Sequence, residues 1–146
     1  MSRSRKLTPV VTMARQATET ELLKLGEVNA MLQHDQQQLD ELIRYRDEYL
    51  TRFREENSMV NSVKKALDLR GFLAQLDQAI QAQQYQVDSS RSRVEQQRQS
   101  WLQARNKEQA MDTLVARYQA EEVQKQQRRE QRDNDEHTTT IWARKR

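Results

Sequence analysis

The stretch that decides the fold is LRGFLAQLDQAIQAQQYQVDSSRSRVEQQRQSWLQARNKEQAMDTLVARYQAEE, residues 69–122. Steps of alternately three and four residues from Leu69 pass through sixteen positions, eleven of them apolar. An average step of 3.5 residues is the heptad repeat of a left-handed coiled coil. We call these positions the second seam: Leu69, Leu73, Leu76, Ile80, Gln83, Val87, Ser90, Val94, Gln97, Trp101, Ala104, Glu108, Met111, Val115, Tyr118 and Glu122.

The same period occurs earlier in the chain. Between residues 11 and 53 the same stepping passes through thirteen positions, nine of them apolar, which predicts a second long helix with one apolar stripe. This first seam comprises Val11, Ala14, Thr18, Glu21, Leu25, Val28, Leu32, Asp35, Leu39, Leu42, Arg46, Tyr49 and Phe53.

A short polar segment, ENSMVNSV at residues 56–63, separates the two seams. Its Asn and Ser side chains compete with the helical backbone for hydrogen bonds, and a short connection favours antiparallel helices. We therefore expect an all-α protein, a single antiparallel two-helix coiled-coil hairpin. Its expected parts are helix 1 at 9–56, a turn at 57–63, helix 2 at 64–137 and a frayed basic tail at 138–146.

The hairpin predicts which residues face each other. A turn centred near residue 60 places residue i beside residue 120 − i, and helix 2 then outruns helix 1 by two turns or more. Gln83, Ser90 and Gln97 share one heptad position, so we expect the middle of the second seam to be its weakest part. Gly26 and Gly71 lie inside the helices, either as tolerated weak points or as places where a partner approaches closely.

Composition excludes a globular core. Of the 146 residues 35% are hydrophobic and 32% charged, with two Gly, one Pro and no Cys, whereas soluble domains are about 45–50% apolar. Twenty-one Gln join Lys, Arg, Glu and Ala in favouring helices. No apolar run approaches the roughly 20 residues of a membrane span, and no signal peptide is recognisable. We expect a soluble, non-secreted protein without a transmembrane segment.

The chemical inventory is sparse. The two histidines, His34 and His137, lie far apart, and no phosphate-binding loop, metalloprotease motif, nucleophile elbow or calcium loop is present. We expect no enzyme activity, no catalytic residues, no cofactor and no metal site. Despite a pI near 9.3, the basic run KQQRREQRD at 125–133 is brief and diluted by acids, so we expect no nucleic-acid partner.

Basic residues gather near both ends of the sequence. Residues 1–15 carry four basic side chains and no acid, and residues 124–146 carry seven against four acids. The hairpin brings these ends together at its open end. Such an end attracts an acidic protein surface, a phosphate backbone or an anionic membrane, unless its charges are simply solvated.

Aromatic residues gather on both sides of the predicted turn. Two helical stripes lie on one side of the hairpin, and they consist of Gln38, Leu42, Tyr45 and Tyr49 on helix 1 and Phe72, Leu76, Ala79 and Gln83 on helix 2. Exposed aromatic patches with polar rims mark docking sites, and the alternative is a slightly wide hydrophobic seam.

Four segments carry a resemblance to a known family. LIRYRDEYLTRF at 42–53, FLAQLDQAI at 72–80, WLQARNKEQAMDTLVAR at 101–117 and the RRxxR…DE tail at 128–136 resemble the FliJ family. The resemblance spans residues 20–136 and rests on the order of the aromatics as well as on the heptads. It implies a long antiparallel two-helix coiled coil, a small non-enzymatic component and general chaperone of bacterial flagellar type III export.

The resemblance also implies partners and a location. The partners are the hexameric flagellar export ATPase, the cytoplasmic domain of the export-gate membrane protein and the flagellar export chaperones. The location is cytoplasmic, peripherally on the cell membrane at the flagellar base, in a pathway serving flagellum assembly, motility and chemotaxis. The ATPase contact falls near the two termini, and the gate-binding face maps onto Gln38, Leu42, Tyr45, Tyr49, Phe72, Leu76, Ala79 and Gln83. Two alternatives remain, a rod of a non-flagellar type III secretion system and a generic scaffold that homodimerises through the same face.

Overall fold

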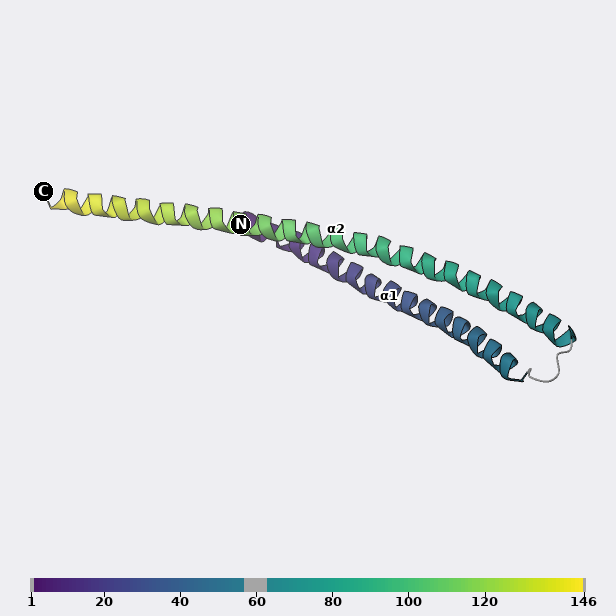
Figure 1. Ribbon diagram of the computed structural model, residues 1–146. Helices are drawn as coiled ribbons and strands as arrows, with labels where there is room; N and C mark the ends of the chain where they lie inside the picture. Colours follow the sequence, from purple (N-terminus) through teal and green to yellow (C-terminus); the bar gives the residue numbers. More distant parts are fainter. Residues whose placement is uncertain (1, 57–62, 146) are drawn as a thin grey trace. The chain divides into compact units, whose positions relative to one another are not determined.

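The computed structural model describes residues 2–56 and 63–145, and the described chain forms two helices (Figure 1). Helix α1 spans Arg3–Glu56 and α2 spans Val63–Arg144, and no strand occurs in these two ranges. The helices pack against each other, which confirms the predicted all-α helical hairpin. The turn expected at 57–63 lies outside the described residues except for Val63, which opens α2.

Helix α1 starts six residues earlier than the sequence led us to expect. The Ser2 hydroxyl accepts a hydrogen bond from the Arg5 amide (3.4 Å), and the Ser2 carbonyl accepts one from the Lys6 amide (3.3 Å). Ser2 therefore caps the helix, satisfying a backbone donor that has no partner within the first turn. Pro9, which we expected at the helix start, lies inside α1.

Helix α2 continues to Arg144, whereas we expected a frayed tail from residue 138. Side chains four residues apart support this part of the helix, because the Gln131 amide donates to the Asp135 carboxylate (3.3 Å). The Thr139 and Thr140 hydroxyls donate to carbonyls one turn earlier. The sequence expectation did not take these local pairs into account.

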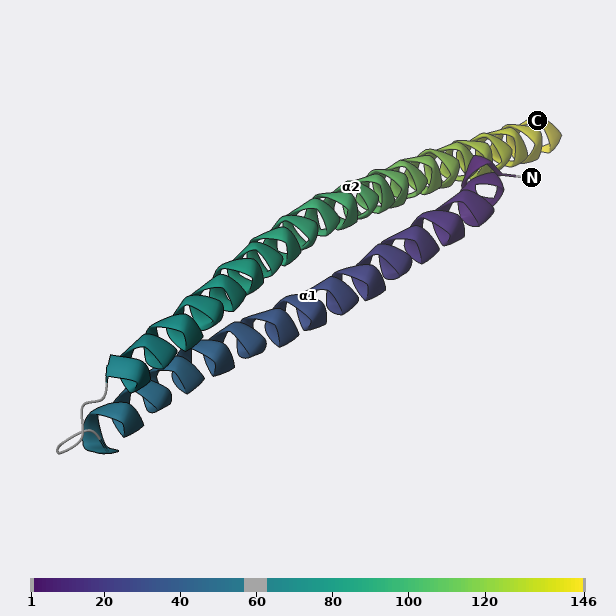
Figure 2. The same cartoon turned by 90° about the vertical axis from the view of Figure 1, so that its right-hand side faces the viewer.

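The chain divides into two compact units, each built from a piece of both helices. The terminal unit comprises residues 1–20 and 102–146, and the aromatic unit comprises residues 21–101. In the aromatic unit the two pieces run side by side in opposite directions (Figure 2, α1 blue and α2 teal to green). The pairs Glu21–Gln97, Asp35–Ser90 and Arg46–Asp77 establish the antiparallel order there.

The register differs slightly from the expected one. The rule 120 − i places residue 85 beside Asp35, and its observed partners are Gln83 and Ser90. In the terminal unit, Ser4 contacts Glu122 rather than a residue near 116. A heptad seam looks alike after each repeat, so apolar spacing alone leaves the register open by a turn or two.

Burial follows the two seams. Every position of the first and second seams is buried or half-buried, including the polar ones. Among the described residues five apolar side chains are buried, two of them in the terminal unit and three in the aromatic unit: Val11, Ala14, Leu39, Leu76 and Val87. Such a thin core follows from the low apolar content of the chain.

Polar residues interrupt this core in a regular way. The Ser90 hydroxyl donates to the buried Asp35 carboxylate (2.5 Å), and the Gln83 amide donates to the Asp35 carbonyl (2.9 Å). One heptad further along α2, the Gln97 amide donates to the carbonyl (3.1 Å) and the carboxylate of Glu21. The polar heptad position is thus filled by hydrogen bonds between the helices, which specify register where apolar contacts do not.

Candidate docking site on the aromatic unit

Three aromatic rings meet between the two helices of the aromatic unit. The Tyr49 and Phe72 ring centroids lie 4.4 Å apart, and Tyr45 lies 6.2 Å from Phe72 and 6.5 Å from Tyr49. Spacing of four residues puts both tyrosines on one face of α1, and the antiparallel register brings Phe72 of α2 to them. We call these three residues the aromatic cluster. Its tilted and edge-on ring pairs are the arrangements that aromatic side chains prefer.

The cluster is ordered but incompletely covered. Tyr45 keeps 49% of its surface exposed, while Tyr49 and Phe72 are half-buried. Two helices offer only one narrow seam, so the outermost ring has no further element to pack against. The cluster therefore presents aromatic surface that is held in place by its inner members.

The other five predicted site residues fall into two groups. Gln38 and Ala79 are exposed and Leu42 is half-buried, and helical spacing places Leu42 one turn from Tyr45, with Gln38 and Ala79 two turns from the rings. Leu76 is only 8% exposed, and the Gln83 amide is engaged with the Asp35 carbonyl. Leu76 and Gln83 therefore belong to the seam, and Gln83 lies about three turns of α2 away from Phe72.

An ion pair next to the cluster was missed by sequence reasoning. Arg46 Nε donates to Asp77 Oδ1 at 2.7 Å, which ties the two helices together beside the rings. The signal was present, because Arg46 is a charged residue at a first-seam position and requires an opposite charge across the seam. Seam spacing alone did not identify Asp77, which lies just outside the second seam.

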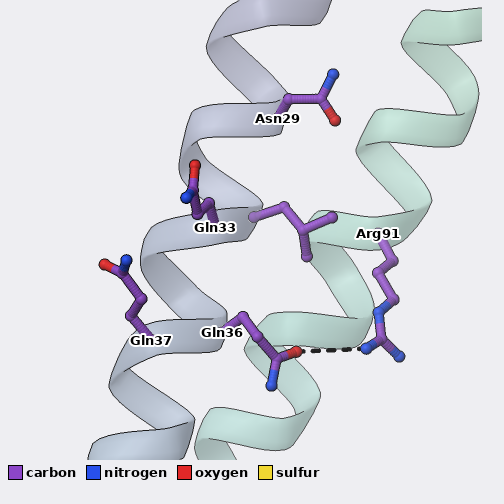
Figure 3. Close-up of a pocket in the computed structure, with 6 residues that line it drawn as sticks. Asn29, Gln33, Gln36, Gln37 and Arg91 are labelled. Carbon is purple, nitrogen blue, oxygen red and sulfur yellow. Dashed lines mark hydrogen bonds between the residues drawn. The ribbon is translucent and has the colours of Figure 1, made fainter.

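A shallow hollow lies farther along the same unit (Figure 3). Its lining consists of one leucine, four amide side chains and one guanidinium: Leu32, Asn29, Gln33, Gln36, Gln37 and Arg91. The Arg91 guanidinium donates a hydrogen bond to the Gln36 side-chain oxygen (3.3 Å). It contains no carboxylate, histidine or nucleophile. Across the described residues no group of His, Cys, Asp or Glu gathers to hold a metal. The hollow can offer hydrogen bonds to a surface but no reacting group.

In the terminal unit charged side chains form contacts between α1 and α2. Glu122 accepts hydrogen bonds from the backbone amide (3.1 Å) and the hydroxyl (2.9 Å) of Ser4, and these bonds lower the pKa of Glu122. Arg15 reaches Glu108 (4.0 Å) and Asp112 (3.4 Å), and the Arg3 guanidinium lies 5.5 Å from the centre of the Tyr118 ring.

Neither helix, over its described residues, has the length and apolarity needed to span a bilayer.

Fold and site together define a helical-hairpin coiled coil that carries an aromatic cluster with one exposed ring, Tyr45. A family model described as Flagellar FliJ protein matches residues 3–146, essentially the whole chain. The chain therefore belongs to the FliJ family, whose members are non-enzymatic components of flagellar protein export. No curated protein and no solved structure matches it.

Proposed function

We propose that this protein links the flagellar export ATPase to the export gate, with the aromatic cluster as its docking site for the cytoplasmic domain of the export-gate membrane protein. The observation that carries this proposal is an aromatic cluster that is preordered by contacts across the helices and still half-exposed at Tyr45. Family membership supports the pathway, and the cluster supports the site.

The cluster has the properties of a binding hot spot. Aromatic side chains in a packed setting dominate binding energies, and rings already held in place lose little entropy when a partner covers them. The Arg46–Asp77 pair supplies polar groups beside the rings. A partner that buries Tyr45 against an apolar pocket therefore gains most of its affinity from one small area.

The terminal unit is the proposed contact for the ATPase ring. Its α1 piece carries Arg3, Arg5 and Lys6 without an acid in the first fifteen residues, and these cations attract an acidic surface, whereas Arg15 is already paired with Glu108 and Asp112. Exposed charges are screened by salt, which makes this contact sensitive to ionic strength. The flagellar export chaperones are the third proposed partners, and the proposed location is the cytoplasmic side of the membrane at the flagellar base.

Binding to the purified gate domain tests the cluster. Tyr45→Ala removes an exposed ring and should weaken binding more than about tenfold, since hot-spot truncations cost about 2 kcal/mol or more. The triple change Tyr45→Ala, Tyr49→Ala and Phe72→Ala should abolish both binding and motility. Circular dichroism checks that each variant stays helical.

Tyr85→Ala is the matched control, because Tyr85 is a 68% exposed tyrosine of α2 outside the cluster. Equal losses for Tyr45→Ala and Tyr85→Ala, or motility that survives the triple change, would remove the docking assignment. Light scattering tests the scaffold alternative, since a stable dimer instead of a 17.4 kDa monomer would favour it.

ATPase activity tests the second contact. The protein should stimulate the cognate flagellar export ATPase at low salt and less at high salt. Stimulation of equal size at both salt concentrations would contradict a contact made by the basic residues. If the protein is helical and binds the gate domain but does not stimulate the ATPase, only the proposed ATPase contact is rejected.

A further inference from the structure

The part of α2 that follows Glu122 has no cover. Ser4, near the start of α1, contacts Glu122, and every described side chain from residue 123 to 145 is exposed. These residues fall into two stretches of different chemistry. The composition of the first stretch is typical of a solvent-exposed helix, and that of the second is not.

The first stretch, residues 124–137, is electrically balanced and contains no large apolar side chain. Its charged residues are four basic and four acidic: Lys125, Arg128, Arg129, Arg132, Glu130, Asp133, Asp135 and Glu136. Opposite charges four residues apart, such as Arg129 with Asp133, stabilise an exposed helix. This stretch requires no partner.

The second stretch, residues 138–145, carries an apolar pair among cations, and we call it the Trp142 segment. Trp142 is 67% exposed and Ile141 is 41% exposed. The Lys145 amide donates to the Ile141 carbonyl (3.2 Å), so the helical hydrogen-bond pattern reaches Lys145. Thr138, Ile141, Trp142 and Lys145 stand at i, i+3, i+4 and i+7, which places them on one face.

We propose that the Trp142 segment binds the surface of an anionic lipid bilayer. Tryptophan prefers the headgroup region, where its ring is apolar and its N–H finds water, and Lys and Arg are attracted to anionic lipids. Arg144 and Lys145 supply that charge, with no acidic residue after Glu136. The proposal rests on the membrane location proposed above and gives it a structural basis, and it does not depend on the gate contact.

The size of the segment favours lipid over a protein partner. A stable protein interface buries about 800 Å² on each side, which two apolar residues and two cations do not provide. A bilayer needs no complementary shape, and apolar contact adds to charge attraction there. A short amphipathic turn at the end of a solvated helix fits a weak, salt-dependent membrane contact.

Flotation of the full chain with vesicles tests this proposal. The chain should float with phosphatidylglycerol–phosphatidylcholine vesicles, less so at high salt, and should not float with phosphatidylcholine alone. Trp142→Ala should reduce binding about tenfold, and Arg144→Glu with Lys145→Glu should reduce it at least as much. Brominated lipids should quench the fluorescence of the unaltered chain and leave that of Trp142→Ala, which retains Trp101, unchanged.

Two controls make the result specific. Arg128→Glu with Arg129→Glu changes the net charge by the same amount inside the balanced stretch and should leave binding within about twofold of the unaltered chain. Tyr85→Ala removes an exposed aromatic elsewhere and should change nothing. Equal losses for the two charge variants would mean that net charge alone drives binding. Vesicle binding that survives Trp142→Ala, or a loss in ATPase stimulation instead, would overturn the proposal.

Discussion

The two units share the heptad spacing of the seams, but different side-chain contacts join the helices in each unit. In the aromatic unit three rings and a 2.7 Å ion pair join the helices, and Leu39, Leu76 and Val87 are buried in the same unit. In the terminal unit Val11 and Ala14 are buried, and polar side-chain contacts join the helices: a carboxylate on Ser4 and an exposed arginine between two acids. Apolar contacts resist salt and acid, whereas exposed charge pairs do not. The comparison indicates a stable docking region and a terminal region whose closure depends on solution conditions.

The largest expected effect comes from the core of the aromatic unit. Leu39 is only 4% exposed, so Leu39→Ala should lower the free energy of unfolding by about 2–4 kcal/mol through lost transfer energy and the cavity left behind. Urea denaturation followed by circular dichroism measures it. Leu23→Ala, at an exposed leucine of the same helix piece, serves as control and should cost well under about 1 kcal/mol.

A second test concerns the buried polar pair. Ser90→Ala removes the donor to the Asp35 carboxylate and should cost about 1–3 kcal/mol, because a buried acceptor is left unsatisfied. Adding Asp35→Ala should recover part of that loss, since both polar groups are then absent. Fully additive costs in a double-mutant cycle would show that the two side chains do not interact.

The seams were predictable because burial follows spacing directly. Even Asp35, Ser90 and Gln97, polar residues at seam positions, are covered as the period requires. The aromatic cluster followed from the same reasoning, since i, i+4 spacing and an approximate register bring Tyr45, Tyr49 and Phe72 together.

The hydrogen-bond partners were less predictable. Whether Asp35 meets residue 83, 85 or 90 depends on a register shift of a few residues, which heptads do not determine. The early start of α1 depended on a single cap at Ser2, a short signal beside the stronger one of Pro9. Leu76 illustrates the same limit, because its spacing fits both the exposed stripe that starts at Phe72 and the second seam. Only the packing of the helices shows that Leu76 is buried in the seam.

Acid should open the terminal unit before it affects the cluster. The hydrogen bonds from Ser4 lower the folded-state pKa of Glu122, so their stabilisation is present above the unfolded pKa and is lost as the pH falls through the lowered one. Amide hydrogen exchange at Ser4 should therefore accelerate, relative to its intrinsic rate, as the pH is lowered below about 4.3. Glu122→Gln should remove most of this pH dependence, and an unchanged profile in that variant would contradict the assignment.

The smallest expected effect is stabilising. A methyl group at Gly26 or Gly71 would meet nothing within 4 Å, and both residues are helical, so Gly→Ala should raise the free energy of unfolding by up to about 1 kcal/mol each. Thermal denaturation measures this gain. Gly71 precedes Phe72, so gate binding of Gly71→Ala also reports whether a partner approaches the backbone there. Unchanged affinity would mean that it does not.

Hydrogen exchange of the full chain with and without the gate domain tests the central claim most directly. Docking through the aromatic cluster predicts slowed exchange in residues 38–49 of α1 and 72–79 of α2, with residues 3–20 unchanged. Protection confined to the terminal unit, with the cluster exchanging as in the free protein, would contradict the account.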